Sequence, residues 1–190
     1  MRKSKSGFTI VELIIVIVVI AILATISVVL YKNVQERAKN SQTIGAANQW
    51  LKALEIYKVR NGSFPSVSSC LGSNYMYNSD ALGTSGIGQC RQDTAAVGVT
   101  SNSTFLTAMS PYITGNPTPA MVTAKSTATL WYRGLYYYIG AGNIARLDMA
   151  LTPANGGCPG QLGDINLNTD ATTTDGNYLC TYTIGSSTSY

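Results

Sequence analysis

Apolar residues dominate the segment from Phe8 to Leu30, in which only four side chains are polar: Thr9, Glu12, Thr25 and Ser27. At 1.5 Å of rise per residue, these 23 residues form about 35 Å of helix, whereas the hydrocarbon core of a bilayer is about 30 Å thick. The pattern therefore predicts a membrane-spanning helix over residues 8–30. Only basic charges precede this segment, so the positive-inside rule predicts a cytoplasmic N-terminus and an exported remainder.

The pattern changes between residues 31 and 61, where apolar side chains recur at spacings of three and four: Ala47, Trp50, Leu51, Leu54 and Tyr57. This spacing is typical of an amphipathic helix that packs one face against a domain. No proline lies between Phe8 and Phe64, so the two helical segments are expected to be continuous. Asn61-Gly62 followed by Pro65 predicts the end of the helix.

The remainder, residues 62–190, predicts a small globular head. Residues 62–103 are rich in Ser, Gly, Asn and Thr, which predicts a long loop, and Ser103 is expected to cap a short helix from Thr104 to Met109. Residues 129–139 and 144–151 predict a β-hairpin, and alternation from Tyr178 to Ile184 predicts a third strand. The expected fold class is α+β: a long N-terminal helix packed on a small antiparallel sheet at about residues 129–184.

Four cysteines, Cys70, Cys90, Cys158 and Cys180, all lie in the part that is expected to be exported. An even number in such a domain favours disulfides, and four cysteines allow three connectivities. We favour Cys70–Cys90 and Cys158–Cys180 because each pair closes a local loop. A zinc site is the alternative, but the sequence has no CxxC motif and no histidine.

The charge and the residue types limit the function classes. The formal net charge of +4 includes three basic residues before Gly7, so the chain from Phe8 onward carries +1. Without histidine, paired carboxylates or a glycine-rich phosphate loop, we expect no enzyme and no cofactor. The tyrosines at 132, 136, 137 and 138 allow a stacking surface for a ligand or nucleic acid, but a buried strand face with one subunit contact is the preferred interpretation.

Glu12 is an unexpected residue in an apolar segment. A carboxylate at the centre of a membrane helix costs about 2–3 kcal/mol on insertion scales, less near the interface, and is a functional-site hypothesis by default. Its natural partner is a cation, such as the free amine of Phe8 after a cut behind Gly7. An amine from a neighbouring helix that is offset along the membrane normal would satisfy the carboxylate better. Glu12 then sets the register of an assembly.

At these residues the chain resembles the type IV pilin and pseudopilin family, whose pattern is a short basic leader ending in Gly, then Phe, then a Thr-Leu-Ile-Glu variant and a hydrophobic helix. Here it stands as Lys5-Ser6-Gly7-Phe8-Thr9-Ile10-Val11-Glu12-Leu13-Ile14. The resemblance implies that prepilin peptidase cuts between Gly7 and Phe8 and N-methylates Phe8. It also implies that Glu12 pairs with a neighbour's amine. An ordinary secretory signal peptide has a shorter apolar region, of about 7–15 residues.

The ending Asn61-Gly62-Ser63-Phe64-Pro65 also resembles the segment after the long helix of many family members. Many type IV pilins carry a proline within the membrane half of the helix, whereas Val28, Val29 and Leu30 occupy that area here. Some pseudopilins bind calcium in the C-terminal region. A degenerate calcium-loop pattern occurs there, although Thr169 stands where the EF-hand glycine belongs: Asp164, Asn166, Asn168, Asp170 and Asp175. A surface loop is the alternative interpretation.

The domain organisation that we expect is a leader at 1–7, a transmembrane and assembly half of the helix at 8–30, an amphipathic half at 31–61 and a head at 62–190. The resemblance implies a structural filament subunit for adhesion, twitching motility or DNA uptake. Its partners would be copies of itself, other pilins, prepilin peptidase, an inner-membrane assembly platform and, before assembly, membrane lipid. After assembly the protein would be extracellular. A pseudopilin of a secretion or competence machine and a membrane-anchored adhesin that never polymerises remain the alternatives.

Overall fold

The computed structural model describes residues 7–73, 75, 88–92, 98–127, 130–140, 142 and 144–186. The chain divides into two compact units, Met1–Gln35 and Glu36–Tyr190. Helix α1 (Ile10–Asn61) contributes to both units, and Gly62 follows its last residue with a positive φ of 78°. The predicted helix and its end are therefore confirmed. The leader expected at 1–7 lies, apart from Gly7, outside the described residues.

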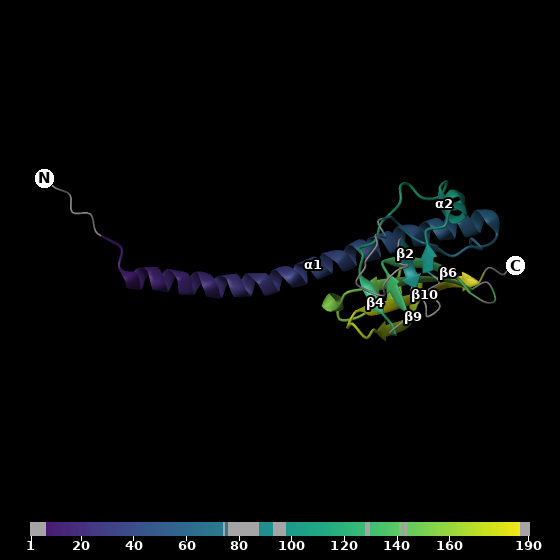
Figure 1. The fold of residues 1–190 in the computed structure, drawn as a ribbon. Coiled ribbons are helices and arrows are strands. Elements are labelled where there is room, and N and C mark those ends of the chain that lie inside the picture. The colour runs from purple at the N-terminus through teal and green to yellow at the C-terminus, as the bar shows by residue number, and fades with distance from the viewer. Residues whose placement is uncertain are drawn as a thin grey trace. The chain divides into compact units, whose positions relative to one another are not determined.

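The second unit contains two antiparallel sheets, whose strands Figure 1 labels where there is room. The larger sheet has the order β1-β6-β7-β10-β9-β8, and the smaller has the order β3-β2-β5-β4. The strands of the larger sheet are β1 (Ser69–Cys70), β6 (Leu135–Ile139), β7 (Ile144–Leu151), β8 (Gln161–Leu162), β9 (Ile165–Thr172) and β10 (Tyr178–Ser186). Those of the smaller sheet are β2 (Gln89–Gln92), β3 (Gly98–Thr100), β4 (Thr123–Lys125) and β5 (Trp131–Arg133). The α+β fold class is confirmed.

The core lies between α1 and one face of the larger sheet. The predicted apolar positions of α1 are buried as far as Leu54, and Tyr57 is partly buried beside them. Alternate residues of the central strands face the helix, among them Tyr137 of β6, Leu147 of β7 and Tyr182 of β10. Because successive side chains of a strand point to opposite faces, the residues between them line the outer face of the sheet.

Helix α2 (Ser103–Met109) packs against α1, as Figure 1 shows near the C-terminal end of α1. The rings of Trp50 and Phe105 lie 6.0 Å apart between centroids. The expected cap residue was wrong by one position. Asn102, not Ser103, caps this helix, because the Asn102 side chain accepts a hydrogen bond from the backbone N–H of Phe105 at 3.1 Å.

The expected single strand at 129–139 is wrong, because it is divided at Gly134. Residues 128 and 129 lie outside the described part, β5 joins the smaller sheet and β6 joins the larger one. Gly134 has a positive φ of 63°, and a Cβ there would lie 3.0 Å from Pro119 and 3.1 Å from the Tyr75 hydroxyl. A glycine is needed where the chain turns from one sheet to the other under such close contact.

The loop expected at 62–103 is also partly wrong, because its described residues include three short strands, β1, β2 and β3. Strands of two to four residues are too short to produce a visible alternation in the sequence. The Cys70–Cys90 disulfide joins β1 to β2. The sheets therefore extend beyond the expected range of about 129–184 on both sides.

Candidate functional site

The first turn of α1 holds the residues that the sequence singles out. The backbone N–H and the hydroxyl of Thr9 donate to one carboxylate oxygen of Glu12 at 2.9 and 2.7 Å. The backbone N–H of Glu12 donates to the Thr9 hydroxyl oxygen at 3.3 Å. Thr9 immediately precedes the helix, and Glu12 is its third residue, so the pair forms a capping box. These bonds satisfy backbone donors that a helix start leaves without partners.

The capping box gives Glu12 a local structural role that was not predicted from the sequence. The signal was present as Thr-x-x-Glu at the start of the apolar segment, which is the usual capping-box pattern. A carboxylate near a helix N-terminus is also favoured by the helix dipole. Glu12 therefore has two candidate roles, to cap the helix and to bind a cation from outside the chain. The two roles can be separated experimentally because only the second needs the charge.

The large apolar side chains between Phe8 and Val34 form a surface that the other described residues of this unit do not cover. Every large hydrophobic side chain from Phe8 to Val34 whose surroundings are described is exposed, from 48% at Val16 to 80% at Phe8. By length and composition, α1 is the one helix among the described residues that can cross a membrane. Exposed apolar patches of this extent indicate a lipid or protein contact surface.

The second unit joins its part of α1 to the sheet by buried polar contacts as well as by the apolar core. The Asn40 side chain donates to the carbonyl of Thr152 at 3.0 Å and accepts from its backbone N–H at 2.8 Å. The hydroxyl of Thr43 accepts from the backbone N–H of Ala120 at 3.2 Å. Asn40 and Thr43 are fully buried, so they fix the position of this helical segment on the head.

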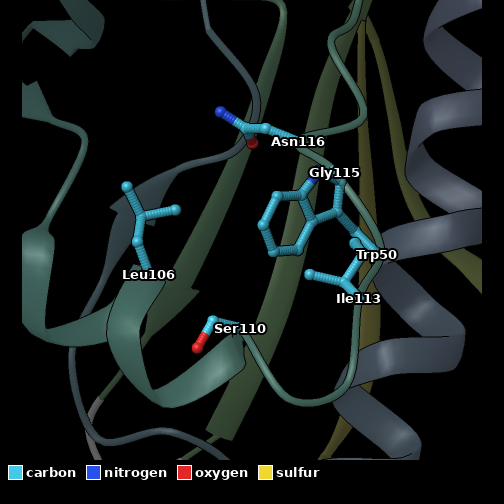
Figure 2. Close-up of a pocket in the computed structure, with 6 residues that line it drawn as sticks. All are labelled: Trp50, Leu106, Ser110, Ile113, Gly115 and Asn116. Carbon is cyan, nitrogen blue, oxygen red and sulfur yellow. The ribbon is translucent and has the colours of Figure 1, made fainter.

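A shallow pocket lies between α1, α2 and the chain that follows α2, as Figure 2 shows. Its volume is about 360 Å³, and its lining residues are Trp50, Leu106, Ser110, Ile113, Gly115 and Asn116. The indole N–H of Trp50 already donates to the carbonyl of Pro117 at 2.9 Å. The hydroxyl of Ser110 likewise donates to the carbonyl of Thr107 at 2.9 Å, and Asn116 is the other polar side chain of the lining.

The structure contains two disulfides, Cys70–Cys90 and Cys158–Cys180. This is the pairing that we predicted because each bond closes a local loop. Cys180 lies on β10, and Cys158 lies in the segment between β7 and β8. The second disulfide therefore ties the segment after β7 to the strand that pairs with β7. With all four cysteines oxidised, they offer no thiolates to zinc.

The calcium-loop residues do not converge. Residues 165–172 form strand β9 rather than a loop, with Asn166, Asn168 and Asp170 exposed along it. Asp164 precedes the strand and Asp175 follows it, and eight residues of extended chain span about 26 Å. Asp175 instead accepts from the backbone N–H of Lys125 at 3.3 Å. Among the described residues, no group of three Asp, Glu, Cys or His side chains could hold a metal ion.

The four tyrosines of the aromatic cluster do not share one surface. Tyr137 is fully buried in the core beneath α1, and its hydroxyl donates to the carbonyl of Pro65 at 2.7 Å. Tyr136 and Tyr138 of β6 and Tyr132 of β5, a strand of the smaller sheet, belong to a separate cluster. The expected buried strand face is therefore present at Tyr137, while the other three rings lie together elsewhere.

These features define a class: an α+β head that follows a helix with a capped start and an uncovered apolar surface. Comparisons with known proteins agree with that class. Residues 2–28 match the family described as the prokaryotic N-terminal methylation motif. A stretch of 70 residues is 33% identical to the type II secretion system core protein G of Pseudomonas aeruginosa. No solved structure matches the chain.

The match to the secretion protein covers 37% of this chain and 49% of that relative, so the chain spans about half the length of the curated relative it matches. The motif and the relative together support the type IV pilin and pseudopilin family, and the fold with one long N-terminal apolar helix is consistent with it.

Proposed function

We propose that this chain is a structural subunit of a filament of the type IV pilin class. Residues 1–7 are a leader removed between Gly7 and Phe8, and Phe8 is then N-methylated. Residues 8–30 span the membrane before assembly with the N-terminus in the cytoplasm, residues 31–61 carry the head, and residues 62–190 form it. The observation that carries the proposal is the methylation motif at the start of a helix whose large apolar side chains from Phe8 to Val34 are exposed where they are described.

The physical argument is the burial of that surface. Lipid covers the apolar side chains of residues 8–30 before assembly, and copies of the same helix cover them in the filament. Moving between these two environments costs little hydrophobic energy, because lipid tails are as apolar as the side chains. Polar contacts then specify the position of each subunit. The amine of one Phe8 and the Glu12 carboxylate of a neighbour supply such a contact.

The relative from a type II secretion system supports a second candidate, a pseudopilin in a short secretion filament. Both candidates use the same helix packing, and neither requires a catalytic group. They differ in the length and place of the filament. Recovery of the chain from sheared surface fibres supports a pilus with a role in adhesion, motility or DNA uptake. Recovery only from the envelope of a secreting cell supports the pseudopilin. A non-polymerising adhesin would enter no filament.

The experiment that tests the assembly role separates the charge of Glu12 from its capping function. Glu12→Gln keeps the oxygen that accepts from Thr9 but removes the charge, whereas Thr9→Val removes the capping hydroxyl and keeps the charge. We expect Glu12→Gln to lower incorporation into filaments about tenfold or more, as loss of a charge-assisted contact implies. Thr9→Val is expected to assemble nearly as well as the wild type. The measurement is this chain in the filament fraction against the membrane fraction.

The opposite result would assign Glu12 to the helix start. If Glu12→Gln assembles like the wild type while Thr9→Val fails, the ion pair with a neighbour is wrong and the capping box is the functional feature. Glu12→Val removes the charge and the capping carboxylate together, so it is the reference for complete loss of incorporation into filaments. Membrane residence is the control, because none of the three changes adds a charge to the apolar segment.

Processing provides a separate prediction. Gly7→Val is expected to block the cut and leave residues 1–7 on the protein, because a β-branched side chain would replace the only residue type without a Cβ at the junction. Intact-mass spectrometry measures the outcome directly. A wild-type protein that retains residues 1–7, or one that is cut near Ala24, would contradict the proposed leader.

A further inference from the structure

The pocket between α1, α2 and the chain after α2 has a lining that suits an apolar side chain (Figure 2). Trp50 is only 1% exposed, so the apolar surface within reach of an occupant comes from Leu106 and Ile113, which are partly buried. Ser110 and Asn116 are exposed, and none of the described lining residues is charged. Such a pocket disfavours an ion, because a charge that leaves water needs a partner inside.

The second unit also carries an apolar side chain that protrudes. Among its described residues, Ile56 and Val59 are the two large apolar side chains that are exposed, at 46% and 86%. Val59 lies in the last turn of α1. Its neighbours Lys58 and Arg60 place their cations over aromatic rings of the head, 4.9 and 5.8 Å from the ring centres. These cations therefore contact the head and leave Val59 uncovered.

Val59 and the pocket lie on opposite sides of α1. Each residue turns an α-helix by about 100°, so the nine residues from Trp50 to Val59 bring the side chain to about 180° from Trp50. Trp50 faces α2, where the ring of Phe105 lies 6.0 Å away between centroids. Val59 therefore points away from the pocket of its own chain. Only the pocket of another copy is within its reach.

The charges around Val59 match the uncharged pocket. Lys52 and Glu55 precede Val59 by seven and four residues, so both lie on its face of the helix, and both are exposed. Their opposite charges cancel. The face that carries Val59 can therefore approach Ser110 and Asn116 at the pocket without repulsion between like charges.

We propose that Val59 of one copy of this chain inserts into the pocket of a second copy, against Leu106 and Ile113. The inference rests on the proposed filament function, because packed helices bring neighbouring heads together and give a weak contact a high effective concentration. One buried valine changes an affinity by about tenfold to a hundredfold. Because the two contacting patches differ, the contact is heterologous, and repeating it extends an open assembly without forming a closed pair.

The test is disulfide crosslinking of the full chain, both in sheared filaments and in concentrated detergent micelles. The double variant Val59→Cys/Ser110→Cys is expected to form a ladder of covalent multimers on mild oxidation, because each copy carries both partners of the contact. Each single variant should stay monomeric, since identical positions do not meet in a heterologous contact. Asn166→Cys/Ser110→Cys, which uses an exposed position of β9, is the matched control and should form no ladder. Peptide mapping identifies the new bond.

Val59→Asp is the second variant, because a carboxylate is disfavoured in an uncharged pocket. It is expected to lower the amount of this chain in the filament fraction about tenfold. Gln49→Asp places the same charge at another exposed position of α1 and should leave that amount unchanged. Both variants should unfold at the wild-type temperature, because both side chains are exposed.

The outcomes separate this contact from the filament function. A chain that enters filaments without forming the ladder overturns the contact and leaves the filament function intact. A ladder in micelles from a chain that enters no filament supports the contact and contradicts the filament function. A dimer of Val59→Cys alone, or no ladder in either preparation, overturns the contact. Equal losses in Val59→Asp and Gln49→Asp also overturn it, because they show a general effect of added negative charge.

Discussion

Leu23 and Leu54 lie on the same helix, yet Leu23 is 59% exposed and Leu54 is fully buried. Leu23 belongs to the unit of residues 1–35, whose apolar side chains find no cover among the described residues of that unit. Leu54 belongs to the unit of residues 36–190, where it packs in the main core. Apolar side chains therefore have two roles along one helix. Those near Leu23 are exposed and available to lipid or to another chain, whereas those near Leu54 form the core of the head.

The same difference appears in the polar residues. In the first unit, Glu12 is bound by its own neighbour Thr9 through a contact three residues apart. In the second unit, Asn40 of α1 binds Thr152, which lies 112 residues away in the sequence. Local contacts cap a helix wherever it lies, whereas long-range contacts require a folded head. Changes in the first unit should therefore affect assembly, and changes in the core of the second should affect stability.

The largest expected effect comes from making the same substitution in both units. Leu54→Ala should lower the free energy of unfolding of the head by about 4 kcal/mol, because it leaves a cavity in a fully packed core. Leu23→Ala should leave the unfolding of the head unchanged. The measurement is thermal unfolding of the full chain in detergent micelles, followed by near-UV circular dichroism. An equal loss of head stability in both variants would contradict the division into two units.

The disulfide of the C-terminal segment gives the next effect. Replacing both Cys158 and Cys180 by Ser should destabilise the head by about 3 kcal/mol, since the bond closes a loop with a sequence separation of 22. Membrane residence should not change, because the anchor lies in the other unit. Chemical denaturation with and without reductant measures the loss. If the double variant unfolds at the wild-type denaturant concentration, the bond does not stabilise this head.

The smallest expected effect concerns the stability contributed by Asp148, a buried carboxylate of the second unit, in contrast to the exposed Glu12 of the first unit. Burial raises the pKa of Asp148 to about 6, an effect only partly opposed by the hydrogen bond from Thr181 and by the nearby guanidinium groups. Because the folded state disfavours the charged form, the stability that this group contributes is present below pH 4 and lost as the pH rises through 6. Asp148→Asn should therefore stabilise the head by about 2 kcal/mol at pH 8 and hardly at pH 4.

Unfolding curves at the two pH values measure this prediction. Asp148 lines a cavity of about 220 Å³ between the two sheets, and the other described groups of its lining remain in place in the variant: Arg91 of β2, Tyr132 of β5, Tyr136 and Tyr138 of β6, and Arg146 of β7. Asp164→Asn is the matched control, because it makes the same substitution at an exposed position of the head. A gain in Asp148→Asn that is the same at pH 4 and pH 8 would contradict the role of the charge.

The sequence determined the elements whose signals are long and periodic. The apolar segment of residues 8–30 and the stripe from Ala47 to Tyr57 indicate one helix with two different surroundings, because side-chain spacing alone sets which face is apolar. The hairpin of β6 and β7 is visible from its aromatic and alternating residues. The disulfide pairing was also predicted correctly, because each bond closes a local loop.

Only the tertiary structure decided the remaining features. Strand β9 consists largely of Asn, Thr and Asp and was expected to be a loop, but the hydrogen-bonding groups of β10 beside it stabilise it as a strand. Strands of the smaller sheet are too short to be recognised, and the division at Gly134 depends on contacts with Pro119 and Tyr75. The cavity around Asp148 arises where strands from two sheets meet. No spacing along the chain encodes it, because its residues come from separate segments that only folding brings together.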